Sequence, residues 1–305
     1  MLSRRRFLQL AAGATITRAR VQQGVRNSWG ASVIDAHFHF RSVDTALMHM
    51  DGVGIDRAVL LTRAEQDSTA SAAPPDRFTR FTSVDARRTD TIEVLRQAAR
   101  SGTRGFGEMK SQVAVDGPEM RRVYDLAAEV GLPVLLHFQD FSDPSSVGTF
   151  NFGISRFPAL LKQHPRTVFV GHANSFWANI SANVPSDISY PTDPVKPGGL
   201  TDRMLADFPN FYADLSATSG RNALARSPDF SKDFLKRHQD KLIFGSDCGC
   251  RDGMGTGQTN PFPLVAGKCI ARETLTALTE LTSPDVLRKI TSKNVIRLLK
   301  LDRWQ

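Results

Sequence analysis

After Gly30, short apolar runs alternate along the chain with longer segments of helical periodicity. Eight of these runs are rich in β-branched and aromatic residues and are mostly continuous, which is typical of strands buried on both faces. The predicted strands are Ser32–Phe40, Arg57–Thr62, Phe78–Val84, Thr103–Met109, Pro133–Phe138, Thr167–His172, Asn210–Leu215 and Lys241–Ser246.

The segments between the strands predict helices. Asp90–Arg100 and Glu119–Val130 carry apolar residues at i, i+3, i+4 spacing, and Asp285–Leu301 predicts an amphipathic closing helix. Eight strand–helix repeats favour an α/β fold, a parallel (β/α)₈ barrel, formed as a single domain over residues 29–305. A doubly wound open sheet is the alternative, but no glycine-rich dinucleotide fingerprint follows the first strand.

Two long segments predict loops beside the barrel. Asn174–Leu200 follows the sixth strand and Cys248–Lys268 follows the eighth. Long loops in a compact domain are usually functional. The 41% hydrophobic fraction is typical of a globular protein, and no apolar run approaches 18 residues, so we expect no stable membrane insertion.

The net charge of +8 first suggests an acidic partner such as nucleic acid or an anionic membrane. Residues 1–30, however, hold six arginines and no acidic residue. The rest of the chain holds 33 basic and 31 acidic residues, a net of only +2. We therefore expect no nucleic-acid partner.

The N-terminus resembles a twin-arginine export signal, whose pattern is Ser-Arg-Arg-x-Phe-Leu-Lys. Ser3, Arg4, Arg5, Phe7 and Leu8 match this pattern, and Gln9 replaces the lysine. The resemblance implies a leader over residues 1–28, the twin-arginine translocation machinery as partner, and a periplasmic or extracytoplasmic location. The alternative is a disordered basic N-terminus on a cytoplasmic protein.

Polar groups that bind metals end several of the apolar strands. The first strand ends in His-x-His, whose two side chains share a face. Because the carboxyl ends of barrel strands meet at one rim, where barrel enzymes keep their active sites, these groups should converge. They are His37, His39, Glu108, His137, His172 and Asp247. Such a cluster predicts a divalent metal, most simply zinc.

From Val33 to Leu301 this order of ligands resembles the amidohydrolase superfamily, in particular its group of amidohydrolase-related proteins that includes aminocarboxymuconate-semialdehyde decarboxylases. The resemblance implies a (β/α)₈ barrel that holds one or two divalent ions. It also implies that His37, His39 and Asp247 bind the more buried ion.

By the same resemblance, His137 and His172 bind a second ion, or hold water and substrate where only one ion is present. Glu108 resembles the bridging glutamate of the TatD-type nucleases. Other subgroups use a carboxylated lysine at this place, and Lys110 lies two residues further on. Catalytic roles fall to Asp247, as general base, and to His172.

The predicted function is therefore hydrolysis of a small-molecule ester, lactone or amide, in which a metal makes water reactive at neutral pH. The alternatives are a non-oxidative decarboxylase, a TatD-like nuclease, and an exported metal-binding barrel without catalysis. The oligomeric state and the substrate stay open.

Weaker signals surround the rim. Lys110, Trp177, Arg221 and Arg251 follow strand ends and are candidate substrate contacts. Cys248 and Cys250 are open to three interpretations: they bind a soft metal, pair with Cys269, or remain free thiols that shape the loop. The other three histidines lie away from the strand ends and are predicted to be structural or at the surface: His49, His164 and His238.

Overall fold

A computed structural model describes residues 28–142, 147–184 and 188–304. Its eight strands form one parallel sheet in which each strand pairs with the next along the chain. They are β1 Ile34–His39, β2 Arg57–Arg63, β3 Phe78–Ser83, β4 Phe106–Met109, β5 Val134–His137, β6 Phe169–His172, β7 Phe211–Asp214 and β8 Leu242–Ile243. Each predicted strand overlaps the observed strand that has the same place in the order along the chain.

The segment that follows β8 closes the sheet into a barrel. Ala36 N donates to Phe244 O (3.0 Å), and Asp247 N donates to His37 O (2.8 Å). These two bonds join β1 to the residues that directly follow β8, so the prediction of a single-domain (β/α)₈ barrel is confirmed.

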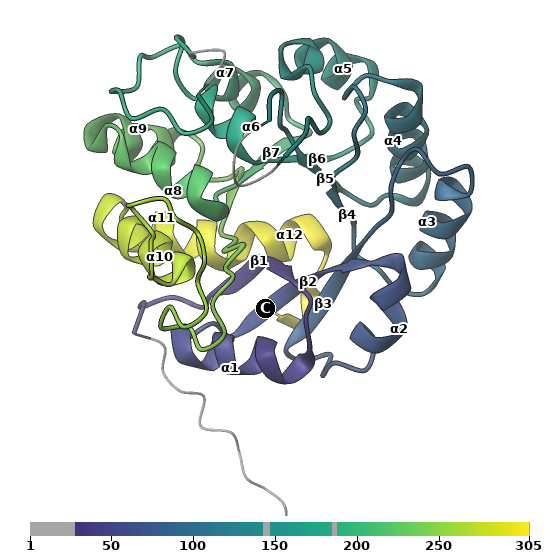
Figure 1. Cartoon of the computed structure of the whole chain (residues 1–305), viewed down its shortest axis with the longest axis horizontal. Helices are drawn as coiled ribbons and strands as arrows, with labels where there is room; N and C mark the ends of the chain where they lie inside the picture. Colours follow the sequence, from purple (N-terminus) through teal and green to yellow (C-terminus); the bar gives the residue numbers. More distant parts are fainter. Residues whose placement is uncertain (1–27, 143–146, 185–187, 305) are drawn as a thin grey trace, which may run out of the picture.

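Helices surround the strands on the outside (Figure 1). They are α1 Val43–Val53, α2 Asp67–Ala70, α3 Thr91–Arg100, α4 Pro118–Val130, α5 Phe157–Gln163, α6 Asn174–Ala178, α7 Leu200–Asp207, α8 Ala217–Ala225, α9 Pro228–Arg237, α10 Ile270–Leu281, α11 Pro284–Arg288 and α12 Asn294–Leu299. The predicted helices over Asp90–Arg100 and Glu119–Val130 correspond to α3 and α4.

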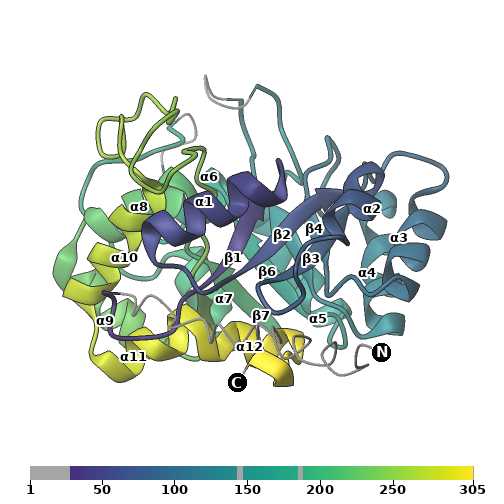
Figure 2. The same cartoon turned by 90° about the horizontal axis from the view of Figure 1, so that it is seen from below.

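The closing helix blocks one end of the barrel. Residues 284–299 run through α11, a π-helical turn and α12. Val295 and Leu299 of α12 pack against Ile34, Val59 and other side chains inside the barrel. In Figure 2, α12 lies beneath the strands, opposite the loop that follows β8. The open end is therefore the carboxyl end, where the predicted ligands lie.

One loop prediction needs correction. The segment after β6 does not begin as a loop, because its first five residues form the buried helix α6. The segment after β8, over residues 248–268, contains turns and bends but neither helix nor strand, as expected.

The predicted leader, residues 1–28, lies outside the described residues except for its last position. Among the described residues, no helix is both long enough and apolar enough to cross a bilayer.

Candidate metal centre

A bulge in β1 turns His37 toward the open end of the barrel. Ile34 and Ala36 point into the barrel interior, so strict alternation would turn His37 outward. The pairing with β2 shifts by one residue between Asp35 and Phe38, and this shift re-aims the side chain.

A similar irregularity lies in β4. Phe106 pairs with Val134 and Met109 pairs with Leu136, so three steps on β4 face two on β5. The extra residue falls beside Glu108, whose side chain is only 7% exposed. Both strands thus depart from regular pairing where they carry a candidate ligand.

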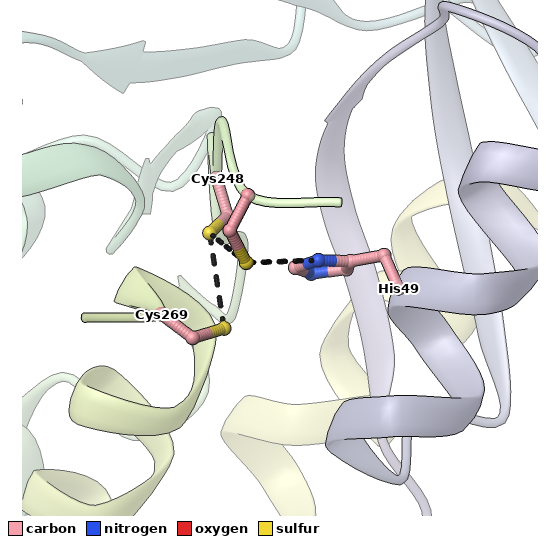
Figure 3. A group of neighbouring side chains, drawn as sticks. His49, Cys248 and Cys269 are labelled. Atoms are coloured by element: carbon pink, nitrogen blue, oxygen red, sulfur yellow. Dashed lines mark hydrogen bonds between the residues drawn. The ribbon is translucent and has the colours of Figure 1, made fainter. Parts of the chain in front are cut away.

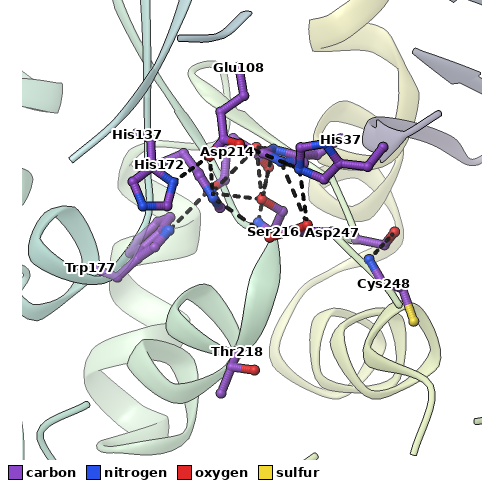
Figure 4. Close-up of polar contacts among 12 residues, drawn as sticks. His37, Glu108, His137, His172, Trp177, Asp214, Ser216, Thr218, Asp247 and Cys248 are labelled. Atoms are coloured by element: carbon purple, nitrogen blue, oxygen red, sulfur yellow. Dashed lines mark hydrogen bonds and ion pairs between the residues drawn. The ribbon is translucent and has the colours of Figure 1, made fainter. Parts of the chain in front are cut away.

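The carboxylate of Glu108 lies between two groups of histidines. Its Oε1 is 2.5 Å from His137 Nδ1 and 3.4 Å from His172 Nε2, and its Oε2 is 3.4 Å from His39 Nε2. Figure 4 shows Glu108, His137 and His172 converging on one another. Glu108 thus lies within 3.4 Å of a nitrogen atom of three histidines.

The other carboxylate, Asp247, faces the His-x-His pair. Its Oδ1 is 3.4 Å from His39 Nε2 and 3.9 Å from His37 Nε2, and the two imidazole Nε2 atoms are 3.4 Å apart. Ligand atoms about 2.1 Å from one tetrahedral ion lie about 3.4 Å apart. The donor set and its spacing therefore fit a divalent metal.

A buried aspartate, Asp214, orients two of the histidines. His37 Nδ1–H donates to Asp214 Oδ2 (2.6 Å), while His172 Nδ1–H donates to Ser216 Oγ (2.8 Å). The Ser216 hydroxyl donates in turn to the same Asp214 oxygen (2.8 Å). With both Nδ1 atoms held in this way, both Nε2 atoms face the centre, as in metal-binding histidines supported by a carboxylate.

Sequence reasoning did not select Asp214 or Ser216. Asp214 ends the apolar strand β7, as the selected ligands end theirs, so the strand-end signal was present. His137 has partners of its own, because its Nε2 lies 3.0 Å from Gln139 Oε1 and its Nδ1 lies 2.5 Å from Glu108 Oε1.

The electrostatic environment of the centre favours cations. Burial opposes a charge on His37, but Asp214 and Asp247 outweigh it and raise the pKa of His37 to about 10. Burial raises the pKa of Glu108, but the charge and hydrogen bond of His137 hold that pKa well below its usual range. The carboxylates that hold a proton on His37 would also attract a metal ion, which would compete with that proton.

His172 behaves differently from His37. Burial, and then the charge of His37, hold the pKa of His172 well below its usual value. His172 is therefore neutral near pH 7, which is the state that binds a metal.

Gly245 allows the centre to pack closely. A Cβ at this position would lie 2.5 Å from Asp214 Oδ1 and 2.7 Å from His37 Cβ, so any side chain would displace the ligand or its support. This requirement is spatial and has no signature in the sequence.

Two cavities open beside the centre. A cleft of about 810 Å³ is lined by His39, Glu108, Arg63, Arg88, Lys110 and neighbours. A smaller cavity of about 190 Å³ is lined by Asp247, His137, His172, Lys110, Tyr190 and neighbours. Asp247 is 29% exposed, so its carboxylate is accessible from the second cavity.

The structure separates the four candidate substrate contacts. Lys110 lines both cavities, and its Nζ lies 4.9 Å from the centre of the Phe150 ring. The other three line neither of these cavities, because each side chain lies elsewhere in the fold.

Trp177 is 1% exposed, and its indole N–H donates to Asp214 O (3.0 Å), so it packs in the core and braces the strand that carries Asp214. Arg221 faces Glu273 and Glu280 of α10, and burial lowers the pKa of its guanidinium. Arg251 is exposed on the loop after β8.

The amidohydrolase family model matches residues 34–301, so the chain belongs to the amidohydrolase family. This family consists of metal-dependent enzymes, and the predictions of family, enzyme class and divalent metal are therefore confirmed. No curated protein sequence matches the chain.

Solved structures share the fold at low sequence identity. The 5-carboxyvanillate decarboxylase of Novosphingobium aromaticivorans, complexed with manganese and a nitrobenzoic acid, is 14% identical with a TM-score of 0.58, over 90% of this chain and 97% of that one. A probable 2-pyrone-4,6-dicarboxylic acid hydrolase of Acinetobacter baumannii, with citric acid bound, is 14% identical with a TM-score of 0.56, over 88% and 99%. The dihydroorotase of Campylobacter jejuni is 14% identical with a TM-score of 0.52, over 89% and 84%.

Proposed function

We propose that this enzyme hydrolyses a small-molecule ester, lactone or amide, and that Asp247 moves the proton. The observation that carries the proposal is the position of Asp247. Its carboxylate lies within 3.9 Å of the Nε2 atoms of His37, His39 and His172, and it also lines a cavity. A carboxylate so placed contacts both the ligand cluster and an incoming substrate.

In this proposal His37, His39 and Asp247 hold the more buried ion. Glu108, His137 and His172 hold a second ion, or hold water and substrate where one ion is present. When bound, a divalent metal polarises the oxygen under attack and lowers the pKa of water. We propose zinc, because histidine-rich sites with one or two carboxylates suit it.

The side chains have distinct tasks. Asp247 accepts the proton of the attacking water and returns it to the leaving group. Neutral His172 carries its proton on Nδ1, which donates a hydrogen bond to Ser216 Oγ. Its Nε2 can therefore bind a metal or accept a hydrogen bond, but it has no proton to give as an acid. Asp214 keeps His37 and His172 in this tautomer.

Lys110 is the proposed anchor for an anionic group on the substrate. It lines both cavities, whereas the other three candidates lie elsewhere. Arg63 and Arg88 also line the larger cleft, but Glu65 and Asp85 line it as well and Arg88 pairs with Glu65, so Lys110 is the cation that carries this assignment. A substrate that carries a carboxylate next to the bond that is broken fits this lining.

The test is a panel of lactones, esters, amides, aromatic carboxylic acids and single-stranded DNA, assayed with Zn²⁺ and Mn²⁺. We expect hydrolysis of one of the first three classes. Asp247→Asn should lower kcat by about 10²–10⁴-fold, the range that general base catalysis contributes. Asp229→Asn, whose side chain is fully exposed, is the matched control and should keep full activity.

The panel also separates hydrolysis from decarboxylation. A hydrolase incorporates ¹⁸O from labelled water into its product, whereas a decarboxylase releases CO₂ without doing so. Release of CO₂, or full activity of Asp247→Asn, would overturn the proposed reaction.

We further propose that the protein is exported in folded form through the twin-arginine machinery. The support is the Ser-Arg-Arg-x-Phe-Leu pattern of residues 3–8, together with the confinement of most of the net charge to residues 1–30. Replacement of the arginine pair tests this proposal.

A further inference from the structure

A second cluster of metal-binding side chains lies apart from the barrel centre. His49 comes from α1, Cys248 and Cys250 from the loop after β8, and Cys269 caps the N-terminus of α10. All four are buried: His49 and Cys250 are 0% exposed, Cys269 is 3% and Cys248 is 7%. Figure 3 shows Cys248, Cys269 and the imidazole of His49 gathered from these separate segments.

The spacing of the cluster matches tetrahedral coordination. The Sγ atoms of Cys248 and Cys250 are 3.3 Å apart, those of Cys248 and Cys269 are 3.8 Å apart, and Cys250 Sγ is 3.4 Å from His49 Nδ1. All four ligand atoms lie within 4.8 Å of one another. Around zinc, with Zn–S about 2.3 Å and Zn–N about 2.05 Å, neighbouring sulfurs lie about 3.8 Å apart and sulfur and nitrogen about 3.5 Å.

Neither disulfide pairing nor ordinary core packing accounts for the cluster as well as metal binding does. The three cysteines are free thiols, and an odd number of thiols cannot all pair in disulfides. His49 is fully buried, and its Nδ1 faces Cys250 Sγ at 3.4 Å. Ordinary core packing does not explain why a buried imidazole nitrogen faces three buried thiols, whereas all four groups are zinc ligands.

The surroundings suit a site with excess negative charge. Three thiolates and one divalent cation leave a net charge of −1. Arg41 donates to the carbonyl oxygens of Cys248, Gly249 and Cys250, which places a guanidinium against the loop. These contacts offset the charge and fix the loop backbone at the same time.

We propose that His49, Cys248, Cys250 and Cys269 bind one structural zinc ion, separate from the barrel metal. Binding releases the three thiol protons and leaves three Zn–S bonds and one Zn–N bond. Four protein ligands fill the tetrahedron, so no position remains for substrate, which is the mark of a structural site.

The proposed ion would tie α1, α10 and the loop after β8 together beside the catalytic carboxylate. Cys248 directly follows Asp247, whose backbone has φ +48°, a conformation that residues with a side chain rarely adopt. Loss of the ion should therefore loosen Asp247 without removing any ligand of the barrel centre.

The experiment reconstitutes the reduced full-length chain with Co²⁺ and records its absorption spectrum. We expect an intense thiolate-to-cobalt charge-transfer band. It should be lost in Cys250→Ser and strongly reduced in His49→Gln. It should persist in His164→Gln, a histidine outside both clusters, and in His39→Gln, which lacks a ligand of the barrel centre only.

A second measurement needs no variant to fold. Native mass spectrometry of the unaltered chain should find a zinc ion that is released by a thiol-specific mercurial, which forms mercury–sulfur bonds in its place. A separate sample, from which acid has removed the zinc, should keep the mass of three free thiols. Absence of the charge-transfer band in the unaltered chain would overturn the proposal. So would a mass two hydrogens lower, which indicates a disulfide. Persistence of the band in Cys250→Ser would do the same. If no substrate of the panel were hydrolysed, the cobalt spectrum and the mass would be unaffected, so the two proposals fail independently.

Discussion

At the scale of single residues, Asp214 decides how the metal centre is held although it is not a ligand. Its Oδ2 receives hydrogen bonds from His37 and Ser216, and Ser216 receives one from His172. Asp214→Asn keeps the shape of the side chain but removes its charge and one acceptor. We expect metal affinity to fall about 10–100-fold, since outer partners of ligating histidines have effects of this size.

The measurement is metal binding by competition with a chromophoric chelator. Ser216→Ala is the graded control, because it disturbs the support of His172 and leaves the direct bond from His37 to Asp214. Its loss of affinity should be smaller. Equal affinity for Asp214→Asn and the unaltered chain would contradict the role assigned to Asp214.

The candidate ligands could be predicted from sequence because each ends an apolar strand, and a parallel barrel brings such ends together. Asp214 carries the same signal, but its side chain bonds an imidazole nitrogen of β1. That contact depends on the closure of the barrel, which brings β7 near β1 with only β8 between them. Trp177 also lies just after a strand, yet it points into the core. Strand ends thus predict which residues reach the rim, but not which way a residue on the following helix points.

At the scale of elements, a polar contact joins α7 to the end of α9. Asp202 of α7 accepts hydrogen bonds from His238 (2.6 Å) and from both terminal nitrogens of Arg237 (2.6 and 3.1 Å). Burial raises the pKa of Asp202, but these partners outweigh it and lower that pKa to about 2. The prediction that His238 is structural agrees with this contact.

The sign of the pH dependence follows from that shift. The pKa of Asp202 is lower in the folded state than the ordinary 3.8, so the unfolded chain binds more protons between these values. The stabilisation is fully present above pH 4 to 5 and is lost as pH falls toward 2. The difference in unfolding free energy between the unaltered chain and Asp202→Asn should therefore shrink by about 1 kcal/mol from about pH 6 to about pH 3.

Urea denaturation at both pH values checks this. Asp233→Asn is the matched control, since Asp233 bonds the same Arg237 but is 62% exposed, and its effect should be small at both pH values. A gap for Asp202→Asn that stays constant from about pH 6 to about pH 3 would show that folding does not lower the pKa of Asp202.

The pattern of apolar runs predicted the order and number of the strands, because strands buried on both faces leave a strong signal. It did not predict the bulges in β1 and β4, which arise from strand pairing rather than from composition. It also missed α6, since five residues are too few to display a helical period.

At the scale of the whole molecule, both candidate metal centres depend on contacts that are distant in sequence. The barrel centre joins His37 to Asp247, and the cysteine cluster joins His49 to Cys269. Neither can form before most of the chain has folded, because residues from its beginning and its end must meet. A route that exports the folded protein would let it acquire metal before it leaves the cytoplasm.

Replacing Arg4 and Arg5 by lysine should therefore block export while leaving the retained protein folded and loaded with metal. The reason is that recognition of the leader would depend on the arginine pair, whereas the metal ligands all lie after residue 36. Fractionation of cells that produce the full-length chain, followed by metal analysis of each fraction, makes the measurement. Arg6→Lys changes the neighbouring arginine outside the pair and should be exported normally. Undiminished export of the double variant would contradict the twin-arginine proposal and would leave the assignment of both metal centres intact, since neither rests on the leader.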